Sequence, residues 1–383
     1  MVSSTPMPMS GKKALSLYIH VPFCTRKCPY CHFYSVVDDE ELKDQFVCAL
    51  SQEVERWHDT ISQREIVSVY FGGGTPFLLG PSHLERLIRL FPLQKSTEIT
   101  IEANPETTTR PLLLAYRALG INRLSIGAQS FSDHYLKTLH RAHSSGQTRN
   151  VLDEALETGW TNISVDLMFD LPGMDLNTWE KTLEEACSLP IQHISLYNLV
   201  IEPKTAWFRN KEAIQALMPA EEVSTQMILS AGAITQSHGF EQYEISAFAK
   251  KGFHSRHNIG YWQGREFLGF GPSAFSFFGN SRFSNIANLK KYCQAIEQNK
   301  TTTETSEEIA PQRRLRELFA IGLRMNAGIS LPYLEEQWGP ADQELISTIH
   351  KLMGLELLEQ HNDTFCLTDR GRLVYDAIAV EII

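Results

Sequence analysis

The sequence predicts an α/β fold: a partial (β/α)6 barrel followed by a small, mostly α, winged-helix-like C-terminal domain. Short apolar runs alternate with longer stretches of helical periodicity over the first two-thirds of the 383 residues. Crossovers of that length return the chain in parallel. Polar residues recur where the apolar runs end, which is typical of barrels that carry their working residues at the carboxyl ends of the strands. A Rossmann sheet is the competing interpretation, but no GxGxxG follows the first run.

Six segments are predicted to be the strands of this barrel. They are 15–21, 65–71, 97–103, 122–128, 162–169 and 193–200. Helical patterns separate most of them, and a further one follows the last strand; the clearest lie at 41–57, 111–120, 151–160 and 221–238. Right-handed crossovers then give either a doubly wound sheet or a barrel.

Changes in composition predict the domain boundaries. Residues 1–13 lack the apolar core of a signal peptide and are expected to form a disordered tail. Residues 14–300 are expected to form the barrel with an aromatic-rich C-terminal extension. The polar stretch TTTETSEE at 301–308 is expected to be a linker that opens a small C-terminal domain, 301–383. From residue 311 onward, seven Lys/Arg stand against eleven Asp/Glu, which argues against the DNA binding common among winged helices.

Charge, hydropathy and cysteine usage restrict the partners and the compartment. The net charge is −10 and no basic run is present, so we expect no nucleic-acid partner. No segment is long and apolar enough for a transmembrane span. The seven cysteines are an odd number with three bunched together, which fits a disulfide framework poorly. These features favour a cytoplasmic protein in a reducing compartment.

Three cysteines, Cys24, Cys28 and Cys31, follow the first predicted strand within eight residues. A zinc site completed by His20 or His32 is one interpretation, but structural zinc usually takes a second short arm of ligands and none is present. Three thiolates can instead hold three irons of a [4Fe–4S] cube and leave the fourth iron open to another ligand. The remaining cysteines lie in predicted helices or remote segments: Cys48, Cys187, Cys293 and Cys366.

Two further features follow predicted strands. In FGGGTP (71–76) the glycines let a ligand approach the backbone, and Thr75 can donate a hydroxyl. Glu102 lies at the carboxyl end of the third strand, where its carboxylate could bind ribose hydroxyls. A salt-bridged carboxylate at the barrel rim is the alternative for Glu102.

The Cys-x3-Cys-x2-Cys spacing after the first strand of a β/α barrel resembles the radical S-adenosylmethionine (SAM) superfamily. That resemblance implies that SAM chelates the open iron and that the reduced cluster can cleave it to a 5′-deoxyadenosyl radical. The segments YIHVPFC, FGGGTP, IEANP, GAQSF, LHRAH and VDLMFDLPG resemble, in order and form, the oxygen-independent coproporphyrinogen III oxidase family over nearly the whole chain. The resemblance implies contacts with one or two SAM molecules from Tyr18, Tyr30, Gly73, Gly74, Thr75, Glu102, Gln129, Arg141 and Asp166.

Two positions distinguish the branches of this family. True oxidases carry a further cysteine two residues after the third ligand, and Phe33 stands at that position here. Residues 257–262, HNIGYW, resemble the HNxxYW signature of the heme chaperone (HemW) branch. A neutral His257 can ligate heme iron axially, and Tyr261 and Trp262 offer flat faces to a macrocycle. A hydrogen-bonded histidine in an aromatic core is the alternative for His257.

The expected function is a heme chaperone on a radical-SAM scaffold. It would bind heme and a SAM-liganded [4Fe–4S] cluster and deliver heme to hemoproteins, including respiratory enzymes at the inner membrane face. Whether the chain is an enzyme is left open by the sequence, and no catalytic residue is assigned. As an enzyme of porphyrin metabolism it would be a coproporphyrinogen dehydrogenase, which decarboxylates coproporphyrinogen III to protoporphyrinogen IX. A zinc-stabilised interaction module is the third interpretation.

Overall fold

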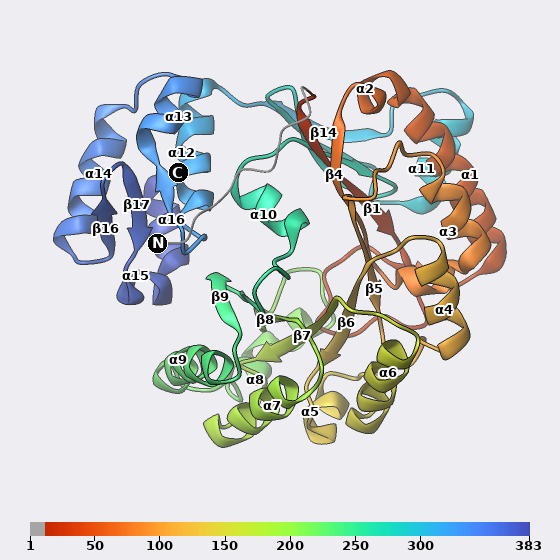
Figure 1. Cartoon of the computed structure of the whole chain (residues 1–383), viewed down its shortest axis with the longest axis horizontal. Helices are drawn as coiled ribbons and strands as arrows, with labels where there is room; N and C mark the ends of the chain where they lie inside the picture. Colours follow the sequence, from red (N-terminus) through yellow and green to blue (C-terminus); the bar gives the residue numbers. More distant parts are fainter. Residues whose placement is uncertain (1–11) are drawn as a thin grey trace.

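The computed structural model describes residues 12–383, and a curved mixed sheet runs through its larger part (Figure 1). The tail expected at 1–13 lies outside the described residues except for Lys12 and Lys13. The sheet has twelve strands in the order β14-β13-β12-β11-β1-β4-β5-β6-β7-β8-β10-β9. Helices cover its outer side, and the C-terminal helices form a separate group beyond one end of the sheet (Figure 1).

The six predicted strands are confirmed, and each pairs in parallel with the next. They are β1 (Ala14–Val21), β4 (Glu65–Gly73), β5 (Glu98–Ala103), β6 (Arg123–Gln129), β7 (Ile163–Phe169) and β8 (His193–Asn198). The expected α/β fold, a partial barrel with six parallel strands, is thus observed. Two short strands, β2 (Phe23–Cys24) and β3 (Val36–Val37), pair with each other outside the main sheet.

Helices follow most of the strands. They are α1 (Glu40–Arg56), α2 (His58–Ser62), α3 (Pro81–Ile88), α4 (Arg110–Ala118), α5 (Asp133–Thr138), α6 (Ser145–Glu157), α7 (Leu176–Ser188), α8 (Lys211–Gln215) and α9 (Glu221–Ser237). The four predicted at 41–57, 111–120, 151–160 and 221–238 correspond to α1, α4, α6 and α9. Helix α6 begins six residues before its predicted start at 151. The reason is a capping box in which Ser144 and Gln147 each bind the other's backbone N–H.

Each parallel strand has an apolar face and a polar face. In β1, Leu15, Leu17 and Ile19 are fully buried in the main hydrophobic core. The alternate positions point into the barrel, where Ser16 accepts a hydrogen bond from Ser68 of β4 at 3.0 Å. The same inner side carries Glu102, Asp166 and the buried His193, whose Nδ1 lies 2.8 Å from Ser164 Oγ. The period-two alternation therefore places polar groups inside the barrel.

The aromatic-rich extension widens the sheet at both ends. Its elements are β9 (Glu241–Glu244), β10 (Ala247–Ala249), α10 (Arg256–Trp262), β11 (Phe267–Phe270), β12 (Phe275–Phe278), β13 (Ser281–Asn285) and α11 (Leu289–Glu297). Strand β10 is antiparallel to β8, whereas β11 is parallel to β1. The sheet therefore continues past β1, and its two ends do not pair to close a barrel.

The prediction of a linker at 301–308 is wrong. Thr303–Glu308 form strand β14, which pairs antiparallel with β13 at the edge of the large sheet. Five of its six residues are exposed, so the strand has no apolar face by which hydropathy could reveal it. Its stability comes from the backbone ladder and from cross-strand polar pairs such as Ser284 and Thr305, whose hydroxyls are 2.6 Å apart.

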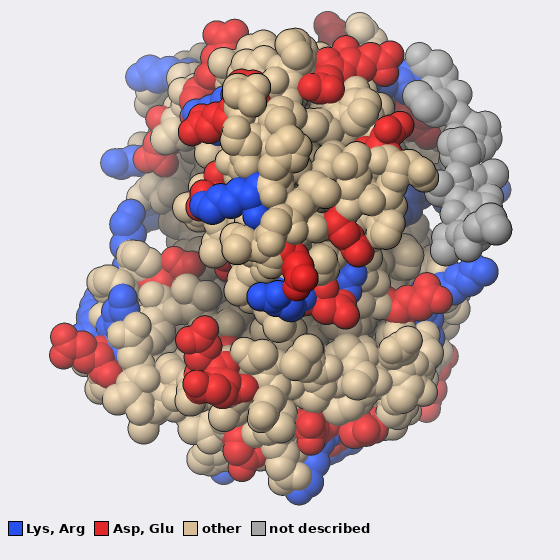
Figure 2. Space-filling model, turned by 90° about the vertical axis from the view of Figure 1, so that its left-hand side faces the viewer, with Lys and Arg blue, Asp and Glu red and all other residues tan. Residues whose placement is uncertain are grey.

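The C-terminal part has its own hydrophobic core, which includes Leu315, Phe319 and Leu345. Its elements are α12 (Pro311–Gly322), β15 (Ile329–Ser330), α13 (Leu331–Trp338), α14 (Gln343–Gly354), β16 (Leu358–His361), β17 (Thr364–Leu367), α15 (Asp369–Leu373) and α16 (Tyr375–Ile382). Five helices and a three-stranded antiparallel sheet agree with the expected small, mostly α, winged-helix-like domain. On the face seen in Figure 2, acidic and basic groups are interspersed and no broad basic patch appears. No helix within residues 12–383 is long and apolar enough to cross a membrane.

Candidate functional site: a cysteine-lined cavity at the carboxyl ends of the strands

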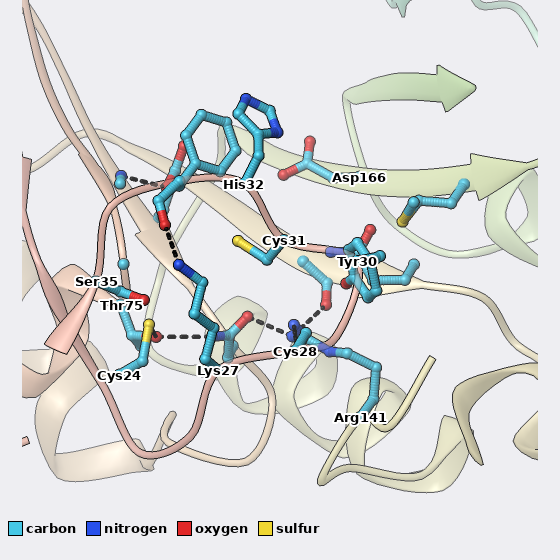
Figure 3. Close-up of a pocket in the computed structure, with 18 of the residues that line it drawn as sticks. Cys24, Lys27, Cys28, Tyr30, Cys31, His32, Ser35, Thr75, Arg141 and Asp166 are labelled. Carbon is cyan, nitrogen blue, oxygen red and sulfur yellow. Dashed lines mark hydrogen bonds between the residues drawn. The ribbon is translucent and has the colours of Figure 1, made fainter. Parts of the chain in front are cut away.

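The cysteine loop is tied down at both ends by short-range pairing. Strands β2 and β3 pair in parallel, so that Cys24 opposes Val37, and Asp38 N donates to Cys24 O at 3.0 Å. Within the loop, Cys31 N donates to Cys28 O at 3.2 Å. Figure 3 shows the cysteines spread along this loop, with Arg141 and Asp166 across from Cys24. The loop thus presents its three thiols from a fixed backbone.

A cavity of about 400 Å³ lies at the carboxyl ends of the parallel strands, and all three cysteines line it. Eight of the nine residues expected to contact SAM also line it: Tyr30, Gly73, Gly74, Thr75, Glu102, Gln129, Arg141 and Asp166. The exception is Tyr18, whose hydroxyl lies 3.1 Å from His20 Nδ1 and whose ring stacks on Tyr70. The contacts with SAM remain predictions, and for Tyr18 the geometry gives them no support.

The three thiols line one cavity, as the ligands of a cluster would. Among the described residues, no group of three or more His, Cys, Asp or Glu side chains that could hold one metal ion is found. In a cube, each thiolate holds a different iron. Burial raises the pKa of the Cys24 and Cys31 thiols, and a hydrogen bond from Thr75 partly offsets this at Cys24. Iron would therefore displace protons when it binds here.

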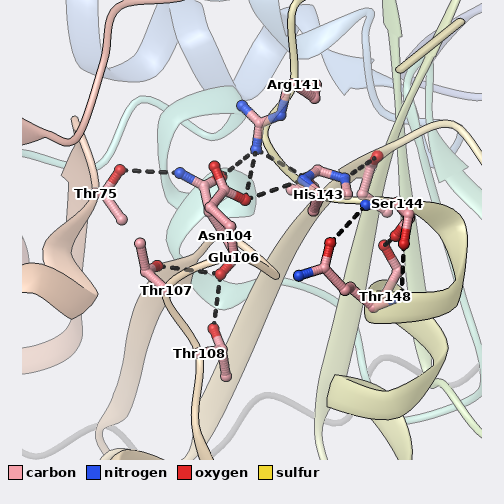
Figure 4. Close-up of polar contacts among 12 residues, drawn as sticks. Thr75, Asn104, Glu106, Thr107, Thr108, Arg141, His143, Ser144 and Thr148 are labelled. Carbon is pink, nitrogen blue, oxygen red and sulfur yellow. Dashed lines mark hydrogen bonds and ion pairs between the residues drawn. The ribbon is translucent and has the colours of Figure 1, made fainter. Parts of the chain in front are cut away.

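A chain of hydrogen bonds connects two of the three cysteines, and Figure 4 shows its middle part, from Thr75 through Asn104 to Arg141. Thr75 Oγ1 donates to Cys24 Sγ at 3.8 Å, and Asn104 Nδ2 donates to Thr75 Oγ1 at 2.9 Å. The Arg141 guanidinium donates to Asn104 Oδ1 at 2.5 Å and to Cys28 Sγ at 3.6 Å. Hydrogen bonds to the sulfurs are one of the factors that set the potential of an iron–sulfur cluster. Thr75 and Arg141 are thus placed to tune it.

Glu106 connects this chain to His143, because it contacts both Arg141 and His143. Glu106 Oε2 lies 2.9 Å from His143 Nδ1 and 3.9 Å from the Arg141 guanidinium. Burial opposes ionisation of Glu106, but the hydrogen bond from His143 and the charge of Arg141 outweigh it and lower the pKa of this carboxyl. The sequence reasoning missed Asn104, Glu106 and His143. The only signal was their position: Asn104 lies in IEANP, Glu106 directly follows it, and His143 ends LHRAH, next to residues that were selected.

The glycine loop (71–76) hydrogen-bonds to the backbone that leads into the cysteine loop, and it also lines the cavity. Gly74 N donates to Val21 O at 2.8 Å, and Thr75 N donates to Phe23 O at 2.7 Å. A Cβ on Gly74 would lie 2.6 Å from Phe23 O, closer than such atoms can approach. Gly73 has a φ of +108°, which a side chain would strain. A substitution at Gly74 would therefore disturb the cysteine loop before it blocked a ligand.

Glu102 is held by neutral donors rather than by a cation. Tyr70 OH donates to Oε1 at 2.9 Å, and Gly73 N donates to Oε2 at 3.1 Å. Burial, together with the nearby Asp166, raises the pKa of Glu102 to about 7. Asp166 itself accepts hydrogen bonds from Ser125 Oγ at 3.1 and 3.3 Å. The cavity thus has two half-buried carboxyl groups that can accept hydroxyl hydrogen bonds.

The raised pKa of Glu102 makes stability depend on pH. Because the folded-state pKa, about 7, is above the ordinary value of 4.5, its stabilising contribution is present at low pH and is lost as pH rises through 7. Glu102→Gln lacks this contribution. Between about pH 6 and pH 8, we expect the free energy of unfolding of the parent to fall by ~1 kcal/mol relative to the variant. Urea unfolding at several pH values measures it, and parallel pH profiles for the two proteins would contradict it.

Comparisons with known proteins agree with this geometry. A family model of the radical SAM superfamily matches residues 18–186, and one of the HemN C-terminal domain matches residues 309–374. The chain is 32% identical to the heme chaperone HemW of Bacillus subtilis, over 94% of this chain and 96% of that protein. This chain belongs to the HemW family. It is also 31% identical to the heme chaperone HemW of Mycobacterium tuberculosis, over 97% and 95% of the two chains.

Other relatives extend the HemW family comparison. The mitochondrial radical S-adenosyl methionine domain-containing protein 1 of Danio rerio is 34% identical over 87% of this chain and 78% of that protein. Among solved structures, coproporphyrinogen III oxidase (HemN) of Escherichia coli matches with a TM-score of 0.85, 24% identity and coverage of 97% and 90%. That likeness shows the fold. The predicted family resemblance is confirmed, and the radical SAM superfamily implies SAM and a [4Fe–4S] cluster as cofactors.

The HemW signature HNIGYW forms helix α10, and its histidine is inside the protein. His257 is 1% exposed. Its Nδ1 lies 2.9 Å from Ser68 Oγ and its Nε2 lies 2.9 Å from Tyr261 OH. Burial, with the charges of Arg265 and Arg123, lowers its pKa to about 3. Both ring nitrogens thus have hydrogen-bond partners, which favours the alternative of a hydrogen-bonded core histidine, and the axial heme ligation by His257 stays a prediction.

Replacing His257 should therefore affect folding more than heme coordination. His257→Ala leaves Ser68 and Tyr261 without their partner and opens a cavity, so we expect the free energy of unfolding to fall by about 3 kcal/mol. Ser68→Ala, which removes one hydrogen bond, should cost about 1 kcal/mol. The visible spectrum of any heme bound by the folded His257→Ala protein should match that of the parent. A changed spectrum in an equally stable variant would restore the axial role.

Proposed function

We propose that this chain is a heme chaperone on a radical-SAM scaffold, which binds heme and delivers it to hemoproteins. The observation that carries the proposal is the similarity, over nearly the full length of both chains, to proteins named heme chaperone HemW at 32% and 31% identity. Delivery to respiratory enzymes at the inner membrane face, and residence in the cytoplasm, are parts of the same proposal.

Different residues of the cavity would hold different parts of the radical-SAM cofactors. Cys24, Cys28 and Cys31 would hold the cluster, which supplies one electron to the sulfonium of SAM when both are bound. Thr75 and Arg141 donate hydrogen bonds toward the sulfurs. Glu102 and Asp166 would accept hydroxyl hydrogen bonds from the adenosyl part. We place no catalytic acid or base among these residues.

Phe33 supports the chaperone over the oxidase. It borders the cysteine cavity, its side chain is 51% exposed, and its ring stacks on His32 with centroids 4.4 Å apart. A phenyl group at this position offers neither the thiol nor the proton donor that a cysteine would supply. The mouth of the cavity therefore differs chemically from the oxidase pattern.

Heme uptake and release test the proposal. Protein reconstituted anaerobically with iron, sulfide and SAM should bind hemin, as followed by its absorbance. It should then activate the apo form of a respiratory heme enzyme faster than hemin presented on serum albumin, which serves as the control. A reconstituted protein that takes up no hemin, or that transfers it no faster than albumin, would overturn the proposal.

A further inference from the structure

A second cavity, also of about 400 Å³, lies between the barrel and the C-terminal domain. It shares no lining residue with the cysteine cavity. One wall is Tyr261 and Trp262, from the exposed end of α10, and another is α12 of the C-terminal domain with Arg313 and Arg314. Helices α10 and α12 contact each other. A ligand in this cavity would therefore touch both domains.

The apolar part of this interdomain cavity is made of aromatic rings. Tyr261 packs edge-on against Phe267 of β11, with ring centroids 4.7 Å apart. Trp262 and Phe277 of β12 also border the space. Flat rings of this kind bind planar apolar molecules through broad contact. The two aromatic residues of the HNIGYW signature thus face this cavity, while its histidine points into the barrel.

The polar part of the cavity is strongly cationic. Four guanidinium groups border it, from Arg265, Arg282, Arg313 and Arg314, against one carboxylate side chain, Glu317. Arg282 and Arg313 are paired with carboxylates, since they contact Glu317 and the more exposed Glu307. Arg265 lies near Glu98 and Glu65, whereas the ion-pair contact of Arg314 with Glu317 is long, at 3.9 Å.

Arg314 is the group that most needs a partner. It is 5% exposed, and its guanidinium lies over the Phe277 ring at 3.7 Å. Its NH2 donates to Gly264 O at 3.3 Å, but its Nε has no hydrogen-bond partner and the Glu317 carboxylate is 3.9 Å from its NH1. Burial, together with the charge of Arg282, lowers the pKa of Arg314 to about 10. A buried guanidinium that is incompletely paired is costly, and an anionic ligand would relieve that cost.

We propose that the interdomain cavity is the heme site, with the propionate edge on the arginines and the macrocycle against the aromatic rings. This inference rests on the proposed chaperone function and names where its ligand sits. A planar apolar body that ends in two carboxylates matches a cavity of flat rings and guanidinium groups. The charged contact is made by Arg314 and its neighbours on α12, so bound heme also ties the C-terminal domain to the barrel.

Hemin and hemin dimethyl ester separate the two kinds of contact. The parent should bind hemin more tightly than the ester, whose propionates carry no charge. Arg314→Met should weaken hemin binding by about tenfold or more and leave the ester unaffected. Arg370→Met, which removes an exposed arginine of the same domain, is the matched control and should change neither. Trp262→Leu should weaken hemin and ester alike.

Further controls test whether the variants fold and whether hemin binding depends on the cluster. Thermal unfolding checks that the variants fold, and Arg282→Met stands in for Arg314→Met if the latter does not. The cluster-free Cys24→Ala protein should still bind hemin, because the two cavities share no lining residue. Hemin binding by the parent that is indifferent to both arginine substitutions would overturn this site and leave the chaperone function standing. If the parent protein binds no hemin at all, both the proposed heme site and the proposed chaperone function are overturned.

Discussion

Cys24→Ala, Cys28→Ala and Cys31→Ala should each yield protein without an iron–sulfur cluster. All three thiols line one cavity on one tied loop, and three thiolates are the minimum hold on a cube that keeps one iron open. Iron and sulfide analysis after anaerobic reconstitution should give about four irons per chain for the parent and almost none for each variant. The visible absorbance of the cluster should disappear in parallel.

The other four cysteines are the matched controls for this experiment. Cys187 and Cys293 are buried in α7 and α11, Cys48 is exposed on α1, and Cys366 is on β17 of the C-terminal domain. Burial raises the pKa of Cys187 to about 12 and that of Cys293 to about 11, so neither readily offers a thiolate. Alanine at any of the four should leave the iron content intact. Cluster loss in one of them, or zinc in place of iron in the parent, would refute the assignment.

The barrel strands could be predicted because each carries its information locally. In β1 the alternation of Leu15, Leu17 and Ile19 with polar residues marks a strand with one buried face. Strand β14 could not be found in this way, because an edge strand with both faces polar differs from a linker only through its partner β13. The early start of α6 depends on a capping box and not on apolar periodicity, so the apolar pattern did not reveal it.

In the site, too, residues that lie in sequence motifs could be predicted, whereas contacts between residues distant in the chain could not. The cysteines and eight of the nine residues expected to contact SAM line one cavity, and they could be named in advance because they lie in sequence motifs that resemble a known family. The partners of Arg141 were missed, since Asn104 is 37 residues away in the chain and meets it only in the fold. The role of His257 depended on Ser68, 189 residues away. No local pattern states whether an imidazole points into a ligand cavity or into the core.

Coproporphyrinogen III should remain unconverted by this protein, even with the cluster reduced and SAM in excess. The oxidase reaction requires abstraction of a propionate β-hydrogen, followed by loss of CO₂ and one electron, at the mouth of the cysteine cavity. Here Phe33 occupies the position of the additional cysteine of the oxidases. Chromatography of the oxidised porphyrins measures the product, with a coproporphyrinogen oxidase of the same fold as the positive control under identical conditions.

The shape of the macrocycle gives a second reason for this expectation. A porphyrinogen has saturated carbon bridges between its pyrrole rings and is puckered, whereas heme is planar. The rings of Tyr261, Trp262 and Phe277 offer flat faces, which favour the planar molecule. Protoporphyrinogen formed by the parent but not by Cys24→Ala would restore the oxidase and overturn the chaperone. Slow release of 5′-deoxyadenosine without loss of CO₂ would instead show SAM cleavage uncoupled from porphyrinogen chemistry, as a cofactor-loaded chaperone allows.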